Sequence, residues 1–451
     1  MTTPTTPHPT TKSLGIWTCT ALVIGNMIGS GIFLLPASLA TYGSISMFGW
    51  LFTSAGAILV ALVFARLARM IPRAGGPYTY SRQGFGDFMG FLIAWGYWIS
   101  LMCGNAAIAV AMVSYAGVFW PALSNSSGVA AAVAGAAVWT LTIVNVMGVK
   151  MAGRVQVVTT VLKLIPLILV ATVGYAFFHP GNFVPLNVSG ESNFAAITAT
   201  ATLTLWAFLG LESATIPAGD VIDPERTIPK ATVLGTIFTA VLYILATAAV
   251  MGIIAPRDLV ASTAPFADAA QRMLGPWAAY FVAAGAAVSC FGALNGWILN
   301  QGQIPLAAAR DGLFPKPFAK VGRSGAPNTA LVISSIFVTI LLATNFTRGL
   351  VGLFTFIILL ATLTSLIPFV FAAAAQLIIF IREKKRFEGQ RLTGASIVAV
   401  LAFLYSLWAV GGSGQETVYW GFLLLLAGIP VYVWIVWKRG KAGQEEVGGR
   451  W

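Results

Sequence analysis

Charge is scarce in this chain, and what is absent excludes whole classes of protein. Of its 451 residues only 9% are charged, 2 are histidines and 3 are cysteines, whereas 58% are hydrophobic and the mean hydropathy is +0.85. There is no polar stretch that could form a soluble domain, no nucleophile–base constellation, no phosphate-cradling loop and no Cys/His cluster with metal-ligand spacing. We therefore expect no enzyme activity, no cofactor and no metal site.

The N-terminal residues and the three cysteines both agree with a membrane protein. Cys19, Cys103 and Cys290 all fall in apolar runs, so they do not form a disulfide framework. Residues 1–12 are rich in threonine and proline, and we expect a disordered tail. This tail lacks the basic region and the small-residue cleavage site of a signal peptide, so the first apolar run is expected to be retained.

Apolar runs separated by Gly, Pro and charged residues predict an all-α polytopic membrane protein with twelve spans. The predicted limits are 14–41, 46–71, 86–118, 128–148, 154–178, 194–217, 230–254, 276–306, 328–346, 350–381, 393–412 and 417–437.

Basic residues predict which side of the membrane the loops face. Of 26 Lys and Arg, Lys163 lies within a span and only Arg257, Arg272 and Arg348 fall on one side, which leaves 22 on the other. Cytoplasmic loops collect such residues, so both termini are expected in the cytoplasm of a cell inner membrane. The net charge of +12 is thus a topology signal, with attraction to anionic lipid. No aromatic-lined basic domain is present, so nucleic acid is not an expected partner.

The first span contains the stretch Gly25-Asn26-Met27-Ile28-Gly29-Ser30-Gly31. Glycine and serine are poor helix formers, and a break in mid-membrane leaves backbone groups that must bind protein, water or a ligand. Gly25 and Gly29 also have the spacing of close helix packing, which is the alternative interpretation. The pair of glycines around Ser30 favours an unwound ligand-binding turn.

The sixth span contains Leu209-Gly210-Leu211-Glu212-Ser213. Of fourteen carboxylates in the chain, only Glu212 lies near the middle of a span. An intramembrane carboxylate is a functional-site hypothesis by default, as a proton carrier or as the partner of a cation. The alternative is a protonated acid that is hydrogen-bonded within the bundle.

The first and sixth spans are thus interrupted in the same way, by glycine with small polar residues. Five spans separate equivalent points, so the two halves must run in opposite directions across the membrane. This pattern predicts an inverted repeat with a site at the bilayer midplane, where N–H groups hold a carboxylate and carbonyls hold an ammonium. We expect residues 13–180 to form the first repeat, 190–381 the second, 392–438 two further spans and 439–451 a cytoplasmic tail.

Four other side chains are unusual at membrane depth. Lys163 lies about 13 Å into the fifth span by helical rise, either as a lysine that extends to the surface or as a buried amine that binds and releases a proton. Asn105 is expected to bond a neighbouring helix or a substrate. Trp206 and Trp297 lie away from the interfaces where tryptophan usually gathers, either packing or acting as gates and a shelf for a cation.

Several motifs together resemble the amino acid–polyamine–organocation transporters, from about residue 12 to 439. They are GNMIGSGIFLLPASLA, GGPYTYSR, YWISLMCGN, LWAFLGLESA, DPERTIPKAT and the DGLFP loop. Within that superfamily the chain is most similar to the branch of arginine/agmatine, lysine/cadaverine and ornithine/putrescine antiporters. The resemblance implies a five-plus-five inverted repeat with discontinuous helices 1 and 6, two extra C-terminal helices, alternating access around one site and often a homodimer.

The resemblance also implies roles for individual residues. It implies that Ser30 and Gly31 bind the substrate carboxylate, and that the carbonyls of Met27, Trp206 and Leu209 lie near the amine. It further implies that the Trp206 ring stacks on the guanidinium of the substrate.

On the side-chain end of the site, the resemblance places Asn105 near the guanidinium and Trp297 and Ile108 along the side-chain path. It implies that Tyr97 closes the outer gate and that Glu212 lies in the acid-sensing region.

Some positions depart from the arginine/agmatine pattern. Leu101 stands where those antiporters have cysteine, Ser100 where they have alanine and Ala361 where they have serine, all around the far end of the substrate. Lys163 replaces a small residue, and proton-coupled and some exchanging members of the superfamily have lysine there in the place of a sodium ion.

We therefore expect a secondary transporter that exchanges a cationic amino acid, arginine first, for its decarboxylated amine. The alternatives are a proton-coupled amino acid symporter of broader range that uses Lys163, and a membrane receptor that binds amino acids without moving them. The expected partners are a small amino acid or amine, membrane lipid and a second copy of the chain.

Overall fold

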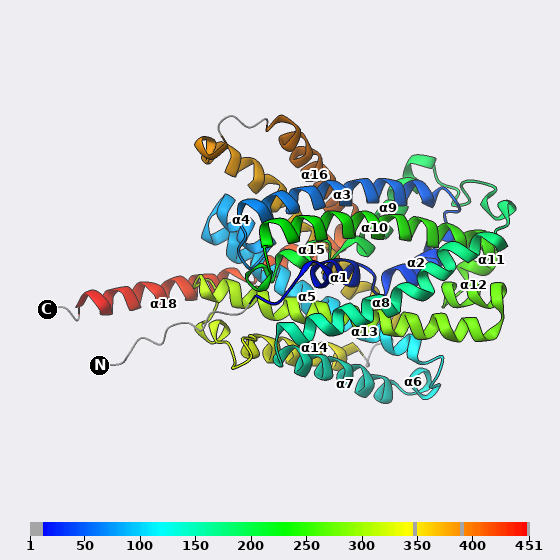
Figure 1. Cartoon of the computed structure of the whole chain (residues 1–451), viewed down its shortest axis with the longest axis horizontal. Coiled ribbons are helices and arrows are strands. Elements are labelled where there is room, and N and C mark those ends of the chain that lie inside the picture. The colour runs from blue at the N-terminus through cyan, green and yellow to red at the C-terminus, as the bar shows by residue number, and fades with distance from the viewer. Residues whose placement is uncertain (1–11, 346–349, 388–391, 449–451) are drawn as a thin grey trace.

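The computed structural model describes residues 12–345, 350–387 and 392–448, and this part of the chain is a helical bundle (Figure 1). Within these ranges the only β-structure is an isolated bridge between Leu14 and Val221. Eleven described helices are long and apolar enough to cross a membrane, and Asn328–Ala343 is a shorter apolar helix at the position of the predicted ninth span. The predicted all-α polytopic fold class is confirmed. The predicted tail up to residue 11 and Arg348 lie outside the described residues.

The helices that form the crossings are α1 Ile16–Met27 with α2 Gly31–Ala40, α3 Ser46–Met70, α5 Asp87–Ala116, α7 Ser127–Val146, α8 Val149–Val173, α9 Asn193–Leu205, α10 Pro224–Ile253, α13 Pro276–Arg310, α14 Asn328–Asn345, α15 Leu350–Arg382, α16 Thr393–Gly412, and α17 Gln415–Leu426 with α18 Ile429–Gly448. The shorter α-helices are α4 Pro77–Phe85, α6 Ala122–Asn125, α11 Pro256–Val260 and α12 Pro265–Leu274. The 3₁₀ turns are η1 Gly174–Phe177, η2 Pro180–Phe183, η3 Trp206–Phe208, η4 Ser213–Thr215, η5 Ala218–Asp220, η6 Lys316–Ala319 and η7 Lys384–Phe387.

Most predicted boundaries agree with the helices within a few residues, and the differences have local causes. The fifth crossing begins at Val149 instead of 154, because Gly148 adopts a positive φ of 118° and makes the turn before it. The seventh begins at Pro224 instead of 230, since proline is well suited to the first position of a helix. α18 continues to Gly448, through most of the segment that we predicted as a tail from 439.

Both predicted interruptions are present. The first crossing is divided into α1 and α2, and the sixth consists of α9 followed only by 3₁₀ turns up to Asp220. The second half of the sixth crossing is therefore less regular than that of the first. Gly210 has φ of 110°, a conformation that an α-helix does not contain.

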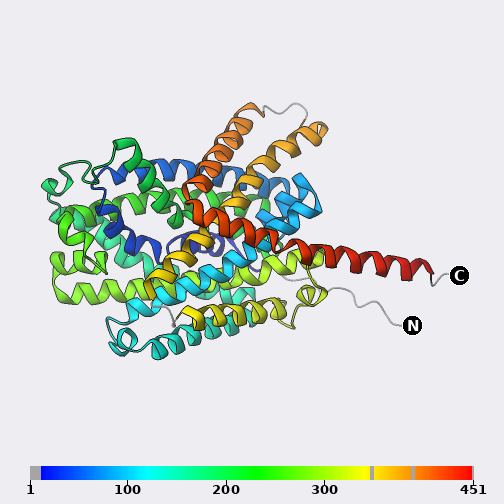
Figure 2. The same ribbon diagram turned by 180° about the vertical axis from the view of Figure 1, so that it is seen from behind.

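Two opposite views show how the ends of the bundle differ (Figures 1 and 2). α18 extends away from the bundle at the end where α4 lies, and α11 and α12 lie at the opposite end. At the α4 end the backbone N–H of Leu14 donates to the carbonyl of Asp220 at 3.0 Å, so the start of the first crossing is joined to the end of the sixth. We call this end, which holds Leu14, α4 and Arg439, the chain-end side.

Candidate functional site

The interruption of the first crossing places three non-helical residues inside the bundle. α1 ends at Met27 and α2 begins at Gly31, so Ile28, Gly29 and Ser30 lie between them. Ile28, Gly29 and Ser30 are buried and Gly31 is partly exposed, so this break faces the interior of the protein. The backbone groups that it exposes must find their partners there.

Side chains of other crossings bind the carbonyls that this break frees. Nε1 of Trp297 donates to the carbonyl of Asn26 at 3.2 Å, and the hydroxyl of Tyr243 donates to that of Met27 at 2.6 Å. The backbone N–H of Gly29 donates to the same Met27 oxygen at 3.0 Å. Two donors use both lone pairs of this carbonyl. The amine contact expected at Met27 stays a prediction, and in this structure Tyr243 and Gly29 are the donors to that carbonyl.

Lys163 is the second group that holds the break. Its side chain is 0% exposed, and Nζ donates to the carbonyls of Gly25 at 2.7 Å, Ile28 at 2.6 Å and Ser289 at 3.1 Å. A lysine ammonium has three N–H donors, and each has an acceptor here. The alternative of a lysine that extends to the membrane surface is wrong, since Lys163 joins α8 to the broken first crossing and to α13.

The interruption of the sixth crossing meets that of the first directly. A Cβ atom on Gly210 would lie 2.9 Å from Cβ of Asn26 and 3.1 Å from the backbone N of Met27. Only glycine fits this close approach, and its positive φ is a conformation that other residues rarely adopt. Gly210 therefore allows the two broken crossings to come into contact.

A cavity lies where the two interruptions meet. Its lining comes from both breaks and from α5, α13 and α15, and the centres of water-sized molecules can occupy ≈ 30 Å³ of it. The lining residues are Asn26, Met27, Gly29, Ser30, Gly31, Ser100, Leu101, Gly104, Ile108, Trp206, Leu209, Trp297, Ala361 and Ser365. No carboxylate is among these described residues, so any cation in this cavity must be held without a paired acid.

Ten of the eleven residues expected to bind a substrate line this cavity. They are Met27, Ser30, Gly31, Ser100, Leu101, Ile108, Trp206, Leu209, Trp297 and Ala361. Asn105 is the exception, because its Nδ2 donates to Oε1 of Gln301 on α13 at 2.7 Å. This is the helix–helix contact that the sequence left open as an alternative. The Oδ1 of Asn105 is buried without a hydrogen-bond partner, and the expected role of Asn105 beside a substrate stays a prediction.

Ser30 provides a polar point in the wall of the cavity. Its hydroxyl is buried and has no hydrogen-bond partner. It directly precedes α2, whose first N–H groups have no acceptor within the helix and carry the positive end of the helix dipole. A hydroxyl and free N–H groups at a helix N-terminus are suited to a carboxylate.

Aromatic rings form the neighbouring walls. Trp206 lies against the start of α2, because a Cβ on Gly31 would lie 2.7 Å from Cδ1 of its ring. Trp297 is on α13 and is 8% exposed, with its Nε1 already bonded to Asn26. The faces of such rings attract cations. The carboxylate-binding turn and an aromatic face are therefore adjacent.

Tyr97 and Glu212 form a buried pair on the chain-end side of the cavity. The Tyr97 hydroxyl donates to Oε1 of Glu212, and the backbone N–H of Gly210 donates to Oε2 at 3.2 Å. α5 begins at the chain-end side, and Tyr97 precedes the cavity-lining Ser100 and Leu101 along it. Tyr97 thus lies between the cavity and the chain-end side, and its expected role as the outer gate stays a prediction.

Hydrogen bonds join the two broken crossings on the chain-end side of the cavity. Oγ of Ser213 accepts from Asn26 at 2.8 Å and from Asn300 at 3.2 Å. Further out, the backbone N–H of Gly75 donates to the carbonyl of Ile216 at 2.8 Å. The loop before α4 thus packs on the second half of the sixth crossing.

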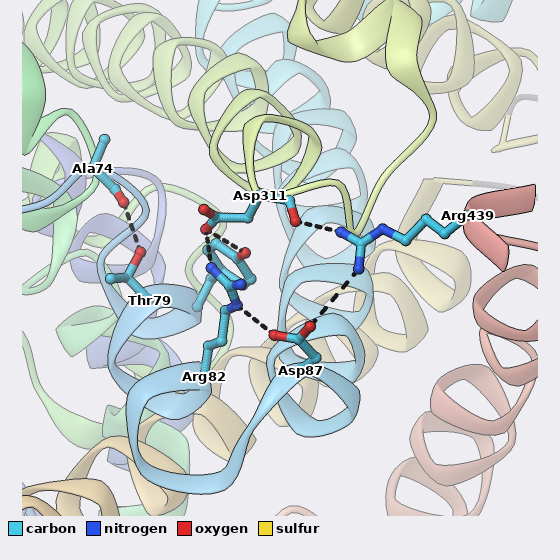
Figure 3. A network of polar contacts seen from close by, with 7 residues as sticks. Ala74, Thr79, Arg82, Asp87, Asp311 and Arg439 are labelled. Atoms are coloured by element: carbon cyan, nitrogen blue, oxygen red, sulfur yellow. Dashed lines mark hydrogen bonds and ion pairs between the residues drawn. The ribbon is translucent and has the colours of Figure 1, made fainter. Parts of the chain in front are cut away.

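An ion-pair network lies at the surface of the chain-end side (Figure 3). Arg82 of α4 contacts Asp87 at 2.7 Å and Asp311 at 2.6 Å, and Tyr78 donates to Asp311 at 2.8 Å. Arg439 of α18 donates to the carbonyl of Asp311. Burial lowers the pKa of Arg82, but its hydrogen bond with Asp87 and the neighbouring charges raise it overall, and burial together with Asp311 raises the pKa of Tyr78. Both groups therefore stay protonated at neutral pH.

Four lining residues were not among those expected to bind a substrate. Asn26 and Gly29 belong to the glycine-rich stretch of the first span, whose pattern already indicated a site. Ser365, in the tenth span, donates to or accepts from Ser100 at 2.5 Å. Gly104 has no side chain, so nothing in the sequence distinguishes it as part of a wall.

Comparisons with known proteins agree with this architecture. A family model described as amino acid permease matches residues 14–435. The cadaverine/lysine antiporter of Escherichia coli (strain K12) is 35% identical over 434 residues, which cover 93% of this chain and 94% of that protein. The putrescine transporter PotE is 31% identical in the same strain, over 93% of this chain and 95% of that protein, and 30% identical in Haemophilus influenzae, over 95% and 98%. The chain belongs to the amino acid permease family and is a membrane transporter, not an enzyme.

Proposed function

We propose that this transporter exchanges a cationic amino acid for the amine left by its decarboxylation, by alternating access of one site to the two sides of the membrane. The supporting observation is the cavity between the two broken crossings. There the unpartnered Ser30 hydroxyl and the start of α2 suit a carboxylate, and the Trp206 face beside them suits a cation.

The two substrates differ only in the carboxylate, and the cavity has a separate feature for each end. An amino acid would use both the α2 turn and the aromatic wall, whereas its amine would use the aromatic wall alone. The cavity holds only ≈ 30 Å³ for water-sized centres, so substrate entry needs Trp206 or the loop before α2 to move. Such a movement would couple binding to the change of access.

Arginine with agmatine is the first pair that we propose, and lysine with cadaverine is its main competitor. The resemblance of the motifs supports the first. The 35% identity with the cadaverine/lysine antiporter supports the second, as do the replacements at Ser100, Leu101 and Ala361. We further propose a cell inner membrane with both termini in the cytoplasm, on the basis of the 22 basic residues that the sequence assigns to one side. We also propose a homodimer, on the basis of the family resemblance.

A substrate panel in proteoliposomes tests this proposal. Vesicles loaded with agmatine, arginine, cadaverine, lysine, putrescine or ornithine should take up labelled arginine rapidly, whereas empty vesicles and vesicles loaded with a neutral amino acid should not. Competition by the same compounds from outside then ranks them. Equal uptake into empty vesicles under an inward proton gradient would contradict obligatory exchange.

That contrary result would support a second candidate, a proton-coupled amino acid symporter. Lys163 is the observation that favours it, because a buried ammonium that joins the broken first crossing to α8 and α13 could release a proton as those contacts open. In this case uptake would dissipate a pH gradient, which a trapped pH dye would report.

The Tyr97–Glu212 pair leads to a prediction about pH. We expect Glu212→Gln to flatten the dependence of the exchange rate on pH, since glutamine cannot take up a proton and Glu212 is one of only two buried charged side chains in the described residues. Initial exchange rates over acid to neutral pH measure this. Tyr97→Phe keeps the carboxyl group and is the control, so its profile should be displaced but not flat. An unchanged profile for Glu212→Gln would assign the proton to another group, with Lys163 next.

A further inference from the structure

A chain of buried amides runs from the scaffold helices to both broken crossings. Asn145 of α7 donates to Oδ1 of Asn295 at 3.2 Å, and Asn295 of α13 donates to Oε1 of Gln156 at 3.1 Å. Gln156 of α8 donates to Oδ1 of Asn26 at 3.3 Å, and Asn26 donates to Ser213 at 2.8 Å. All five side chains are at most 3% exposed. This chain of amides therefore joins α7, α13, α8 and the two breaks, and each side chain in it donates to the next.

Gln156 occupies the centre of this chain, and two glycines make room for it. A Cβ on Gly25 would lie 2.2 Å from Nε2 of Gln156, and a Cβ on Gly296 would lie 1.9 Å from Oδ1 of Asn26. Nε2 also donates to the carbonyl of Ala21 at 3.3 Å. The backbone of α1 and α13 is thus shaped around the contact between Gln156 and Asn26.

Gln156 does not line the cavity, whereas Asn26 does. Its amide both accepts from Asn295 and donates to Asn26, and no other side chain in the chain of amides supplies Asn26 with a donor. A buried amide that loses its partner is costly, so removal of Gln156 would let Asn26 turn away from Ser213. The relation of the two breaks, and with it the shape of the cavity wall, depends on this contact.

We propose that Gln156 is a positioning residue for the substrate site, which acts through Asn26 to hold the broken first crossing in place against the sixth. This inference rests on the proposed transport function for its kinetic readout, but not for its binding readout. It predicts that loss of Gln156 weakens the binding of the amino acid more than that of its amine, because the contact lies beside the broken first crossing, whose α2 turn only the amino acid would use.

The test compares Gln156→Leu with Thr160→Val. Thr160 lies one turn further along α8 and donates at 3.2 Å to the same Ala21 carbonyl, but no hydrogen bond joins it to Asn26. We expect Gln156→Leu to raise the KM for arginine exchange and the Kd for arginine in detergent about tenfold. The maximal rate should stay within about twofold of wild type, as for a loss of uniform binding. Thr160→Val should leave both constants within about twofold. Thermal unfolding and elution as a single species show whether each variant is folded.

Gln156→Glu gives a readout that a purely structural role would not move. An ionised glutamate can accept from Asn295 but cannot donate to Asn26, whereas a protonated one can do both. Its KM relative to wild type, measured at each pH, should therefore return toward one as the pH falls. Lys163 and Glu212, the two charged side chains buried around the breaks, are unchanged in all three variants.

Two results would overturn this inference. The first is that Gln156→Leu has the same KM and Kd as Thr160→Val. The second is that the KM of Gln156→Glu relative to wild type equals that of Gln156→Leu at every pH. If the wild-type protein binds the panel but exchanges none of it, the proposed exchange fails and the Kd comparison still decides the role of Gln156. If wild type exchanges and the variants do not differ, only the inference about Gln156 fails.

Discussion

Lys163→Met is expected to reduce exchange by about 100-fold or more and to lower the thermal stability of the protein. Methionine has a similar length and fits the apolar surroundings, but it supplies no donor. The carbonyls of Gly25, Ile28 and Ser289 would lose the ammonium that binds them at 2.6–3.1 Å. An unpaired buried carbonyl costs about 1–3 kcal/mol. Gly25 and Ile28 both lie at the break of the first crossing, where Ile28 would keep only the hydroxyl of Ser289 as a donor.

Ser289→Ala is the matched control for this prediction. It removes the hydroxyl that donates to the carbonyl of Ile28 at 2.9 Å, but it keeps Lys163 and the backbone carbonyl of Ser289. We expect exchange within about threefold of wild type, since Ile28 keeps one donor. Flux in proteoliposomes and thermal unfolding in detergent measure both variants. Normal exchange by a folded Lys163→Met protein would contradict the prediction.

The same variant separates the two candidate functions. If Lys163 is a proton carrier, Lys163→Met should lose uptake driven by a proton gradient and retain exchange between loaded vesicles. If Lys163 only holds the break in place, both activities should fall together. The geometry favours the second result, because each donor of Lys163 has a carbonyl partner and none is directed into the cavity.

Much of the fold could be predicted because membrane spans are local features of a sequence. Apolar runs bounded by Gly, Pro and charged residues gave the crossings within a few residues, and Gly29, Ser30 and Gly210 marked both breaks. Helix period and depth also indicated Lys163 and Glu212, since a charge in mid-membrane stands out against apolar neighbours.

The remaining features depend on partners that are distant in the sequence. Asn105 bonds Gln301 at a separation of 196 residues, and Tyr97 bonds Glu212 at a separation of 115. Hydropathy shows the depth of such a residue but not the neighbour that it faces. Gln156 was missed for the same reason, because one amide in an apolar helix has no pattern until the helices that surround it are known.

Trp206→Leu is expected to weaken the binding of a cationic substrate about 30-fold and the binding of a neutral amino acid less than about threefold. The described lining of the cavity includes no carboxylate, so the ring face is the main group there that attracts a cation. A desolvated cation–π contact contributes about 2 kcal/mol, which is the basis of the 30-fold loss. Leucine keeps an apolar contact with the start of α2, so the binding of the substrate carboxylate near Ser30 should persist.

The control for this prediction is Trp206→Phe, which keeps an aromatic face and should retain most of the preference for cations. Competition by cationic and neutral amino acids against one labelled substrate gives the ratio for each variant. Equal losses for both kinds of substrate in Trp206→Leu would show that the ring only fills space against Gly31, where a Cβ would lie 2.7 Å from it. Selectivity for the cation would then have to come from Ser100, Ser365 and the carbonyl of Ala361, which are hydrogen-bonded to one another in the wall of the cavity.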